Sequence, residues 1–399
     1  MGFHTTACAP PSDALAYHVA DAIQQSENRK KSRTADALAS FNLAVDLILG
    51  DLFVSYLQDD SHWAYRSERA LAFSGEAVGY KTWKIVIPAL IGLGYVDYHK
   101  GSSRKNPFDE GTYLQGLASR FKVTESLVAL AESHGIRFDE LSDYYITAIP
   151  KNVLRLKASN RGKLGGEELP IDDTTQTRAL SAQVHRLNQY LSQYTLTGGL
   201  FEGYRRSFSN GEFPNFNWNQ GGRLYAVGGH TYQQLSGERR GLMQINGEPV
   251  VEIDVSASHL SIYMGEMGHK VADGSDLYSV EDFAREDVKQ FITMSFGQGK
   301  LPKQWPKKSN IVVGIHDVRE AVCRAIPCLL SLAESGHDWA TLQYLEAETL
   351  IQAMQSLHKK DIPAYCVHDS LIVPVSREQE CRKALTRAWQ IRGWPIRLK

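Results

Sequence analysis

The chain has 399 residues, 43% of them hydrophobic and 22% charged, and its formal net charge is -1. This length allows two or three domains, and the near-zero charge excludes a uniformly basic nucleic-acid-binding protein, so contacts with nucleic acid must come from local patches. The sequence contains neither an uncharged apolar run of about eighteen residues nor a signal-peptide pattern at its start. Its scattered cysteines favour reduced thiols. We therefore expect a cytoplasmic protein that does not bind a membrane.

The N-terminal part of the sequence combines a polar segment with a pattern typical of nucleic-acid binding. Residues 1–33 are polar and end in NRKKSR, which predicts a flexible basic arm. A helical stripe begins at Thr34, and residues 80–105 contain a short helix, a stop at Gly94, a strand and a basic turn. This order resembles a winged helix-turn-helix, in which a helix enters the major groove and the wing contacts phosphates. We assign residues 34–158 to such a winged-helix-like region.

Four basic residues of this region are expected to contact nucleic acid; they are Lys81, Lys84, Arg104 and Lys105. A protein-binding winged helix is the alternative interpretation. Helical periodicity over residues 112–136 predicts that a further helix completes the region. Residues 159–200 follow as a linker rich in glycine and charge and a thumb-like helix, whose apolar stripe is Leu180, Val184, Leu187 and Leu191.

Two aspartates at the ends of predicted strands carry most of the chemistry. The run PVVEIDV (249–255) predicts a buried strand that ends near Asp254, and AYCVHDSLIVPV (364–375) predicts two strands joined by a tight turn that contains Asp369. Paired carboxylates that hold two divalent cations are what in-line phosphoryl transfer requires. Taken singly, a helix N-cap explains Asp254 and a hairpin turn explains Asp369.

A helix predicted between the aspartates favours the metal-binding interpretation. Residues 281–296 are expected to turn one apolar face inward, formed by Val288, Phe291, Ile292 and Ser295. Arg285, Lys289 and Phe296 fall on a different face, within about 40° of one another at helical spacing. Two cations and a ring on one stripe suit a nucleoside triphosphate, because cations bind phosphates and the ring contacts the base. A solvated basic face with Phe296 turned inward is the alternative.

Five blocks in this order resemble the palm of the single-subunit RNA polymerases of phages and mitochondria, which is shared with the family A DNA polymerases. The blocks are GGRLYAV (221–227), IDVSAS (253–258), DLY (276–278), KQFITMSFG (289–297) and VHDS (367–370). The second and fifth blocks have the form found in the RNA enzymes. The resemblance implies an α+β fold in which residues 201–399 form a right-hand polymerase palm with an antiparallel sheet and a fingers helix.

The resemblance also implies a role for each matching residue. Asp254 and Asp369 become ligands of two Mg²⁺ ions, with Mn²⁺ as an alternative, and the backbone carbonyl of Val255 is a further contact. Arg285 and Lys289 bind the triphosphate, and Lys289 is the acid that protonates pyrophosphate. The other implied contacts are Phe296 beside the nascent base pair, Tyr278 near the incoming sugar, Arg223 at the primer or template backbone, and His368 at the primer-terminal phosphate.

Four further residues need separate interpretation. His259, five positions after Asp254, stands where the DNA polymerases usually carry a glutamate that excludes the 2′-hydroxyl and the RNA enzymes carry a glycine, so it leaves the choice of sugar open. A second His-Asp pair precedes a helix, and we interpret Asp317 as its N-cap. Gln343 and Glu346 lie on a helix predicted before Asp369; we interpret both as solvent-facing, and the alternative is that they reach the site.

These features lead us to expect a compact template-directed nucleotidyltransferase, a DNA-dependent polymerase or primase-like enzyme. Ribonucleoside triphosphates are the expected substrates and deoxyribonucleoside triphosphates the alternative. The expected partners are a DNA template and, where the enzyme extends a strand, an RNA or DNA primer. Two other functions remain open: a DNA-binding replication initiator or regulator with a non-catalytic palm, and a template-independent terminal transferase.

Overall fold

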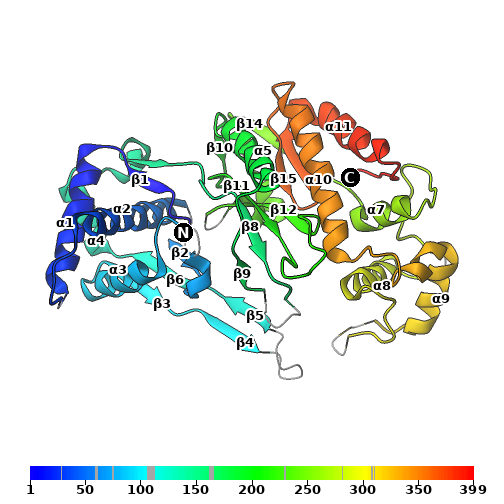
Figure 1. Ribbon diagram of the computed structural model, residues 1–399. Helices are drawn as coiled ribbons and strands as arrows, with labels where there is room; N and C mark the ends of the chain where they lie inside the picture. The colour runs from blue at the N-terminus through cyan, green and yellow to red at the C-terminus, as the bar shows by residue number, and fades with distance from the viewer. Residues whose placement is uncertain are drawn as a thin grey trace.

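The computed structural model describes most of the chain, and the described residues are 1–27, 29–58, 62–73, 76–105, 113–160, 166–228, 231–280, 282–306, 309 and 311–399. Helices and mainly antiparallel sheets give an α+β protein. Its buried hydrophobic side chains form two cores, one drawn from Met1 to Tyr145 and the other from Val153 to Ile396. We call the corresponding parts the N-terminal unit and the C-terminal unit, and they lie side by side (Figure 1).

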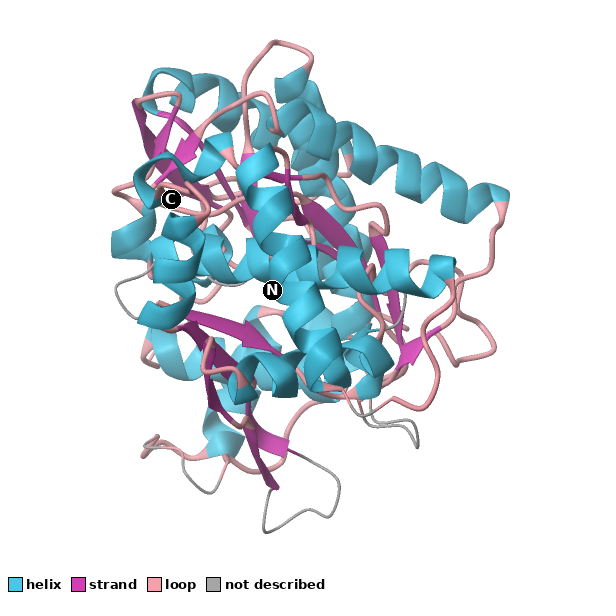
Figure 2. Cartoon of the chain, turned by 90° about the vertical axis from the view of Figure 1, so that its left-hand side faces the viewer, coloured by secondary structure: helices cyan, strands magenta, loops and turns pink. Residues whose placement is uncertain are grey.

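The N-terminal unit is built from helices packed on a small antiparallel sheet. Its helices are α1 (Pro10–Ser26), α2 (Ala35–Gln58), α3 (Tyr80–Gly92) and α4 (Glu125–Ser133), with short 3-10 turns η1 (Ala70–Phe73) and η2 (Phe138–Asp143). The sheet has the order β2 (Trp63–Arg66), β6 (Ser119–Val123), β3 (Val96–His99). Two further pairs are β1 (Thr5–Ala7) with β7 (Tyr145–Thr147), and β4 (Ser102–Lys105) with β5 (Tyr113–Leu117). Figure 2 faces this unit and shows mostly helices toward the viewer.

The predicted helix, stop and strand of residues 80–105 are confirmed. Helix α3 ends at Gly92, Gly94 follows with a φ of 73°, and β3 begins at Val96. Lys81 and Lys84 are exposed on α3, whereas the side chains of Arg104 and Lys105 lie outside the described part of the chain. Helix α2 buries the predicted stripe, which includes Phe41, Val45, Leu49 and Leu52.

Two predictions for the N-terminal unit are wrong. Residues 1–33 are not a flexible arm. Helix α1 places Leu15, Val19 and Ile23 on one face, and these side chains are buried in the first core. Residues 112–136 do not form one helix. In β6 the side chains alternate between buried and outward positions, and only α4 is helical, where Thr124 caps it by accepting a hydrogen bond from the Leu127 amide at 3.4 Å.

Helix α2 is long and apolar enough over Ala35–Leu57 to cross a membrane by length and composition. A core helix meets the same two criteria. Of the most apolar window in α2, 56% is buried inside the protein. Asp46 and Asp51 lie within the helix, and Asp51 accepts a hydrogen bond from the Phe3 amide at 2.8 Å. These contacts place α2 in the first core.

The C-terminal unit contains two sheets and most of the remaining helices. The five-stranded sheet is antiparallel and has the order β10 (Leu196–Thr197), β13 (Gln244–Ile245), β14 (Glu248–Asp254), β16 (Ser370–Pro374), β15 (Tyr365–Val367). The four-stranded sheet has the order β12 (Gly221–Ala226), β11 (Tyr204–Phe208), β8 (Leu154–Lys157), β9 (Glu168–Leu169), with β8 and β11 parallel. The helices are α5 (Thr175–Leu191), α6 (Gly237–Arg240), α7 (Ser258–Glu266), α8 (Arg285–Gln298), α9 (Ile315–Ala325), α10 (Trp339–His358) and α11 (Glu378–Ile391), with 3-10 turns η3 (Tyr232–Gln234), η4 (Pro327–Ser331) and η5 (Val375–Arg377).

The boundary between the two units falls earlier than predicted. We expected the palm-like region to begin at residue 201 and residues up to 158 to belong to the N-terminal region. Strand β8 instead pairs with β11, and helix α5, which lies where it was predicted, packs on the second core. Both elements therefore belong to the C-terminal unit. The pairing of β8 joins segments far apart in the chain, which local periodicity does not reveal.

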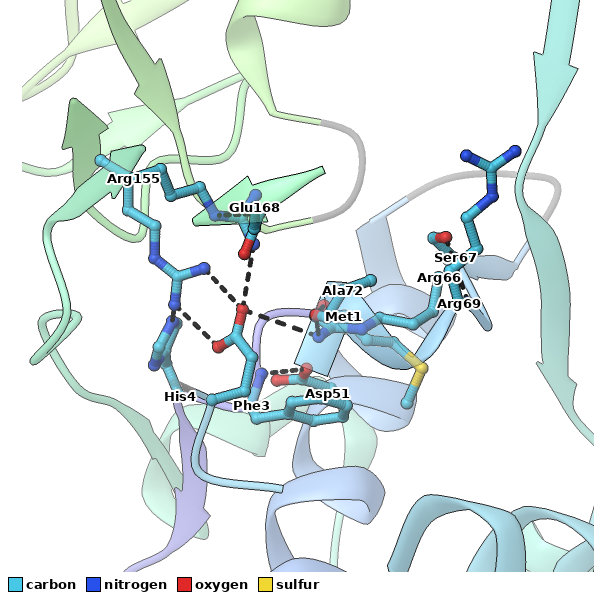
Figure 3. A network of polar contacts seen from close by, with 12 residues as sticks. Met1, Phe3, His4, Asp51, Arg66, Ser67, Arg69, Ala72, Arg155 and Glu168 are labelled. Atoms are coloured by element: carbon cyan, nitrogen blue, oxygen red, sulfur yellow. Dashed lines mark hydrogen bonds and ion pairs between the residues drawn. The ribbon is translucent and has the colours of Figure 1, made fainter. Parts of the chain in front are cut away.

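A buried carboxylate joins the two units. Glu76 of the N-terminal unit is 1% exposed and accepts hydrogen bonds from both terminal nitrogens of Arg205 in β11, at 2.7 and 2.8 Å. Arg155 of β8 and Arg66 of β2 approach the same carboxylate at 3.3 and 3.6 Å (Figure 3). Burial alone would raise the pKa of Glu76, but Arg205 and the other two arginines lower it below its ordinary value. This ionised, buried group fixes one unit against the other.

Candidate active site

The two aspartates predicted to bind metal lie at the neighbouring ends of two adjacent strands, β14 and β16. Asp254 is the last residue of β14 and stands opposite Ser370 of β16 in the antiparallel register. Asp369 is the residue before Ser370, in the tight turn that joins β15 to β16. The Val255 amide donates a hydrogen bond to the carbonyl oxygen of Asp369 at 3.2 Å. The backbone itself therefore holds the two aspartates together.

The two carboxylates are costly to ionise at the same time. Burial, together with the charges of Glu346 and Asp254, raises the pKa of Asp369 to about 7. Burial also raises the pKa of Asp254; Lys399 opposes this shift, and Glu252 and Glu346 add to it. A divalent cation between two such carboxylates would remove their mutual repulsion, so the electrostatics favour cation binding here.

Left-handed backbone conformations lie beside both aspartates. His368, directly before Asp369, has a φ of 54°, and Ala257, three residues after Asp254, has the same φ. Non-glycine residues in such conformations cost about 1–3 kcal/mol each and concentrate at functional sites. Ala257 is the N-cap residue of α7, so the alternative interpretation of Asp254 as a helix N-cap is wrong.

Helix α8 brings two cations to the same place. Arg285 lies in its first turn, where the Nε atom donates a hydrogen bond to the Asp276 carboxylate at 2.8 Å. The guanidinium carbon is 5.2 Å from the centre of the Tyr278 ring. Lys289 lies one turn further along, is 50% exposed, and is 3.9 Å from Glu286. The DLY block therefore holds the arginine of α8 in position, while the lysine is more exposed.

The predicted faces of α8 are confirmed in part. The expected apolar face is buried; its members are Val288, Phe291, Ile292 and Ser295. Phe296 is also buried, at 4% exposure, and its ring centre is 5.4 Å from that of Tyr263. The alternative interpretation, with Phe296 turned inward, therefore describes the ring better. The helix spans Arg285–Gln298 and ends at Gly299, whose φ is 66°, instead of covering 281–296.

Glu346 is buried at this site and not solvent-facing as we predicted. It is 1% exposed on α10. Arg223 of β12 donates a hydrogen bond to Glu346 from Nε at 2.9 Å and contacts the same oxygen through Nη2. The Nε2 atom of His259 is 3.5 Å from the other oxygen. Burial would raise the pKa of Glu346, but His259 and Arg223 lower it below its ordinary value. Burial lowers the pKa of His259. We therefore assign the charge pair to Glu346 and Arg223, beside a neutral His259.

These side chains line one cleft of about 410 Å³. The predicted site residues that it brings together are Arg223, Asp254, Val255, His259, Tyr278, Arg285, Lys289, Phe296 and Asp369. His368 is exposed in the neighbouring hairpin and does not line the cleft. Lys81 and Lys84 lie in the N-terminal unit, so the structure does not bring them to this site.

The second His-Asp pair lies outside the cleft. The N-cap residue of α9 is Gly314, and Asp317 lies in the first turn of that helix, so the predicted capping role of Asp317 is wrong. His316 and Asp317 are both exposed. An acidic residue in the first turn is favoured by the helix dipole, which explains Asp317 without a binding role.

The oxygen donors of the cleft fit Mg²⁺. Among the residues that the structure describes, no group of three or more His, Cys, Asp and Glu is arranged to hold a metal ion. Proteins usually hold Mg²⁺ through one or two carboxylates, with substrate phosphates and water completing the coordination. Asp254 and Asp369 supply that protein share, and Val255 lines the same cleft.

Two residues of the site, Glu346 and Asp276, have no site role in our preferred interpretation of the sequence, although a signal for each is present. Glu346 follows Leu342 by four positions and precedes Leu350 by four, so it lies on the buried stripe of α10. An acidic residue on such a stripe is costly unless it is paired. Asp276 belongs to the DLY block, in which we assigned a role only to Tyr278. Its position nine residues before Arg285 allowed an ion pair that periodicity does not predict.

A scan of the chain against protein-family models finds no match, and a search of the curated proteins finds none either. The function must therefore be inferred from the residues and geometry of the cleft.

Proposed function

We propose that the chain is a template-directed nucleotidyltransferase that starts or extends a strand from nucleoside triphosphates, with a palm like that of the single-subunit RNA polymerases and family A DNA polymerases. The observation that carries the proposal is the Asp254–Asp369 pair on adjacent strands, which lines one cleft with Arg285 and Lys289. Each of the five sequence blocks contributes at least one residue to that cleft. A carboxylate pair next to cations is complementary to a triphosphate with its metal ions.

In this proposal each charged residue of the cleft has a separate role in nucleotide transfer. Asp254 and Asp369 would hold the Mg²⁺ ions, which when bound would activate the attacking hydroxyl for loss of its proton and neutralise charge on the leaving pyrophosphate. Arg285 and Lys289 bind the triphosphate, and Lys289 donates a proton to the leaving pyrophosphate. Asp276 accepts a hydrogen bond from Nε of Arg285 and Glu286 accepts one from Nη1 at 3.2 Å, so within the described residues Nη2 is left to bind a phosphate oxygen.

The N-terminal unit, in the same proposal, delivers the enzyme to DNA. Its elements follow the order α2, β2, α3, β3, hairpin β4–β5, β6, and β6 lies between β2 and β3 in the sheet, as in winged helix-turn-helix modules. The exposed Lys81 and Lys84 of α3 would then meet phosphates beside the groove. The β4–β5 hairpin extends from the body of the unit, where a wing would lie (Figure 1).

Strand synthesis in vitro tests the proposal. The protein is incubated with Mg²⁺, a primed or an unprimed DNA template, and ribonucleoside or deoxyribonucleoside triphosphates in separate reactions. We expect products that match the template and disappear when EDTA removes the metal. If no combination gives a product, the polymerase proposal fails. Products that ignore the template sequence would identify a terminal transferase, and DNA binding without any product would support the initiator or regulator.

Replacing His259 with glycine is expected to raise the ratio of ribonucleotide to deoxyribonucleotide incorporation about tenfold, which corresponds to roughly 1.4 kcal/mol. The imidazole lines the cleft five residues after Asp254, and its removal opens space beside the incoming sugar. Incorporation from mixed triphosphates measures the ratio. His259→Gln retains bulk and a polar contact to Glu346, so it should keep the wild-type ratio. An unchanged ratio in His259→Gly would mean that His259 does not face the sugar.

A further inference from the structure

A second cavity adjoins the cleft on the outer face of the four-stranded sheet. Its volume is about 510 Å³, and residues of β8, β11 and β12 line one side of it. Met1, Gly2 and Arg66 of the N-terminal unit also line it. Trp339, at the start of α10, lines both this cavity and the cleft, so the two spaces are neighbours at this residue. We call the second cavity the basic channel.

The register of the sheet gathers basic and polar side chains on the face toward the channel. Ser207 stands opposite Arg223 and beside Arg155, and Arg205 stands opposite Tyr225. Alternate residues of a strand point to opposite faces. The face toward the channel therefore carries Arg155, Lys157, Arg205, Ser207, Arg223 and Tyr225. The opposite face supplies the second core with Leu154, Leu156, Phe208 and Leu224. One continuous face thus runs from Arg223 in the cleft to Lys157 in the channel.

The channel presents positive charge without a lining carboxylate. Within the described residues, its cationic side chains are Arg66, Arg155, Lys157 and Arg205, and none of its lining residues is Asp or Glu. Glu76 and Glu168 contact these arginines but line a separate cavity. Lys157 forms no ion pair among the described residues, although it is half-buried. The Nε atoms of Arg66 and Arg205 are buried and have no hydrogen-bond partner in that part of the chain.

Two aromatic rings lie along the same path. Tyr225 is 40% exposed on the channel face of β12, which is unusual for a large side chain beside a core strand. Trp339 is half-buried where the channel meets the cleft. A positively charged groove with exposed rings is the arrangement by which proteins bind single-stranded nucleic acid, because the cations follow the phosphates while the rings stack on bases.

We propose that the basic channel binds a single strand of nucleic acid, with phosphates on Lys157 and the neighbouring arginines and a base on Tyr225, and leads it past Trp339 into the cleft. This inference rests on the proposed function and identifies the path of the template strand. Lys157, which has no ion pair within the described residues, supplies a charge for the strand, and the neighbouring arginines contact phosphates while their ion pairs hold the groove wall in place.

The binding test uses the full chain carrying Asp369→Asn, so that no synthesis occurs during the measurement. The probe is a fluorescent single-stranded oligodeoxynucleotide of about 16 nucleotides, the upper limit for comparable grooves, and an abasic strand of equal length serves for comparison. Lys157→Ala should weaken binding of both strands and reduce the slope of log affinity against log salt by about 0.7, as expected for one lost phosphate contact. Tyr225→Ala should weaken binding of the intact strand at least about fivefold and leave binding of the abasic strand unchanged.

Lys360→Ala provides the matched control. Lys360 is exposed just beyond the far end of α10, roughly 30 Å from Trp339 at the rise of an α-helix. This variant should bind both strands like the parent protein. Wild-type affinity and salt slope in both Lys157→Ala and Tyr225→Ala would overturn the channel proposal. An equal loss of intact and abasic strands in Tyr225→Ala would also overturn it, because the ring would then not stack on a base.

Strand synthesis by otherwise wild-type protein separates the two proposals. If synthesis occurs while both channel variants bind the strand normally, the channel proposal fails and the proposed function stands. If synthesis is absent while the channel variants lose binding as expected, the proposed function fails and the channel still binds single strands. Tyr225→Ala changes an exposed side chain, so it remains informative if Lys157→Ala fails to fold.

Discussion

Replacing Asp369 with asparagine is expected to reduce Mg²⁺-dependent nucleotide incorporation by at least about a thousandfold. The substitution keeps the shape of the side chain but removes one of the two charged metal ligands. Loss of a bound metal removes several kcal/mol of transition-state stabilisation, and each 1.36 kcal/mol is a factor of about ten in rate. Single-turnover incorporation measures the effect. Asp317→Asn is the matched control, because it makes the same change in the exposed His-Asp pair at α9.

The same substitution should stabilise the metal-free protein at neutral and alkaline pH. The pKa of Asp369 is about 7 in the folded protein, against about 3.9 in an unfolded chain. Ionisation of a carboxyl group with a raised pKa opposes folding, so the wild type loses this stability as the pH rises from about 4 through 7. Asparagine does not ionise. The gain in unfolding free energy should therefore be near zero at about pH 4 and on the order of 2 kcal/mol at about pH 8, since part of the charge stays solvated.

Urea unfolding in EDTA, at several pH values, measures this difference. A protein that loses activity but gains stability has lost a group that was retained for function at a cost in stability. A destabilised Asp369→Asn at alkaline pH would instead assign the aspartate to the structure of the hairpin. Loss of incorporation by Asp317→Asn would show that the assay does not report on the cleft.

Replacing Glu346 with glutamine is expected to cost about 3 kcal/mol of unfolding free energy and to raise the Mg²⁺ concentration for half-maximal incorporation about tenfold. The substitution leaves Arg223 without its buried counterion, as the two groups are joined by a hydrogen bond at 2.9 Å. The freed guanidinium lies within electrostatic range of Asp369 and would compete with the metal for that carboxylate. Glu346 is therefore a positioning residue in the proposed site.

Glu348→Gln gives the control for this prediction. Glu348 lies two residues further along α10 and pairs with the fully buried Arg206, which also donates hydrogen bonds to Gly222 and Gln183. This variant should lose stability in urea unfolding without a change in the Mg²⁺ dependence. If Glu346→Gln also loses only stability, Glu346 supports the fold and does not position the metal site.

The sequence predicts local features of the site well because they depend on short-range spacing. The hairpin around Asp369, the strand that ends at Asp254 and the buried face of α8 all follow from alternation or helical periodicity. The sequence also places Arg285 and Lys289 on one side of a helix. What it does not provide is the pairing of β14 with β16, which brings the two aspartates together. That proximity was inferred from the order of the five blocks.

The failed predictions share a different cause. The polar composition of residues 1–33 predicts an arm, yet the few apolar side chains of helix α1 fall on one face and are buried. The apolar residues of strand β6 also fit part of a helical pattern, so the sequence predicts a helix there. The charge of Glu346 predicts a solvent-facing position, although its spacing from Leu342 and Leu350 places it on the buried side of α10. In each case tertiary packing or ion pairing determines the observed structure, and local periodicity contains no information on either.

The ion cluster at Glu76 bears on the distance between the DNA-contacting helix α3 and the cleft. Three arginines from both units contact this carboxylate, and we expect the cluster to hold the exposed face of α3 at a set distance from the cleft. A template held as duplex at Lys81 and Lys84 would then reach the cleft as a single strand at a set distance from that contact. Under the proposed function, DNA recognition by the N-terminal unit would therefore set the position at which the C-terminal unit begins synthesis. That start position would depend on the rigidity of the ion cluster at Glu76.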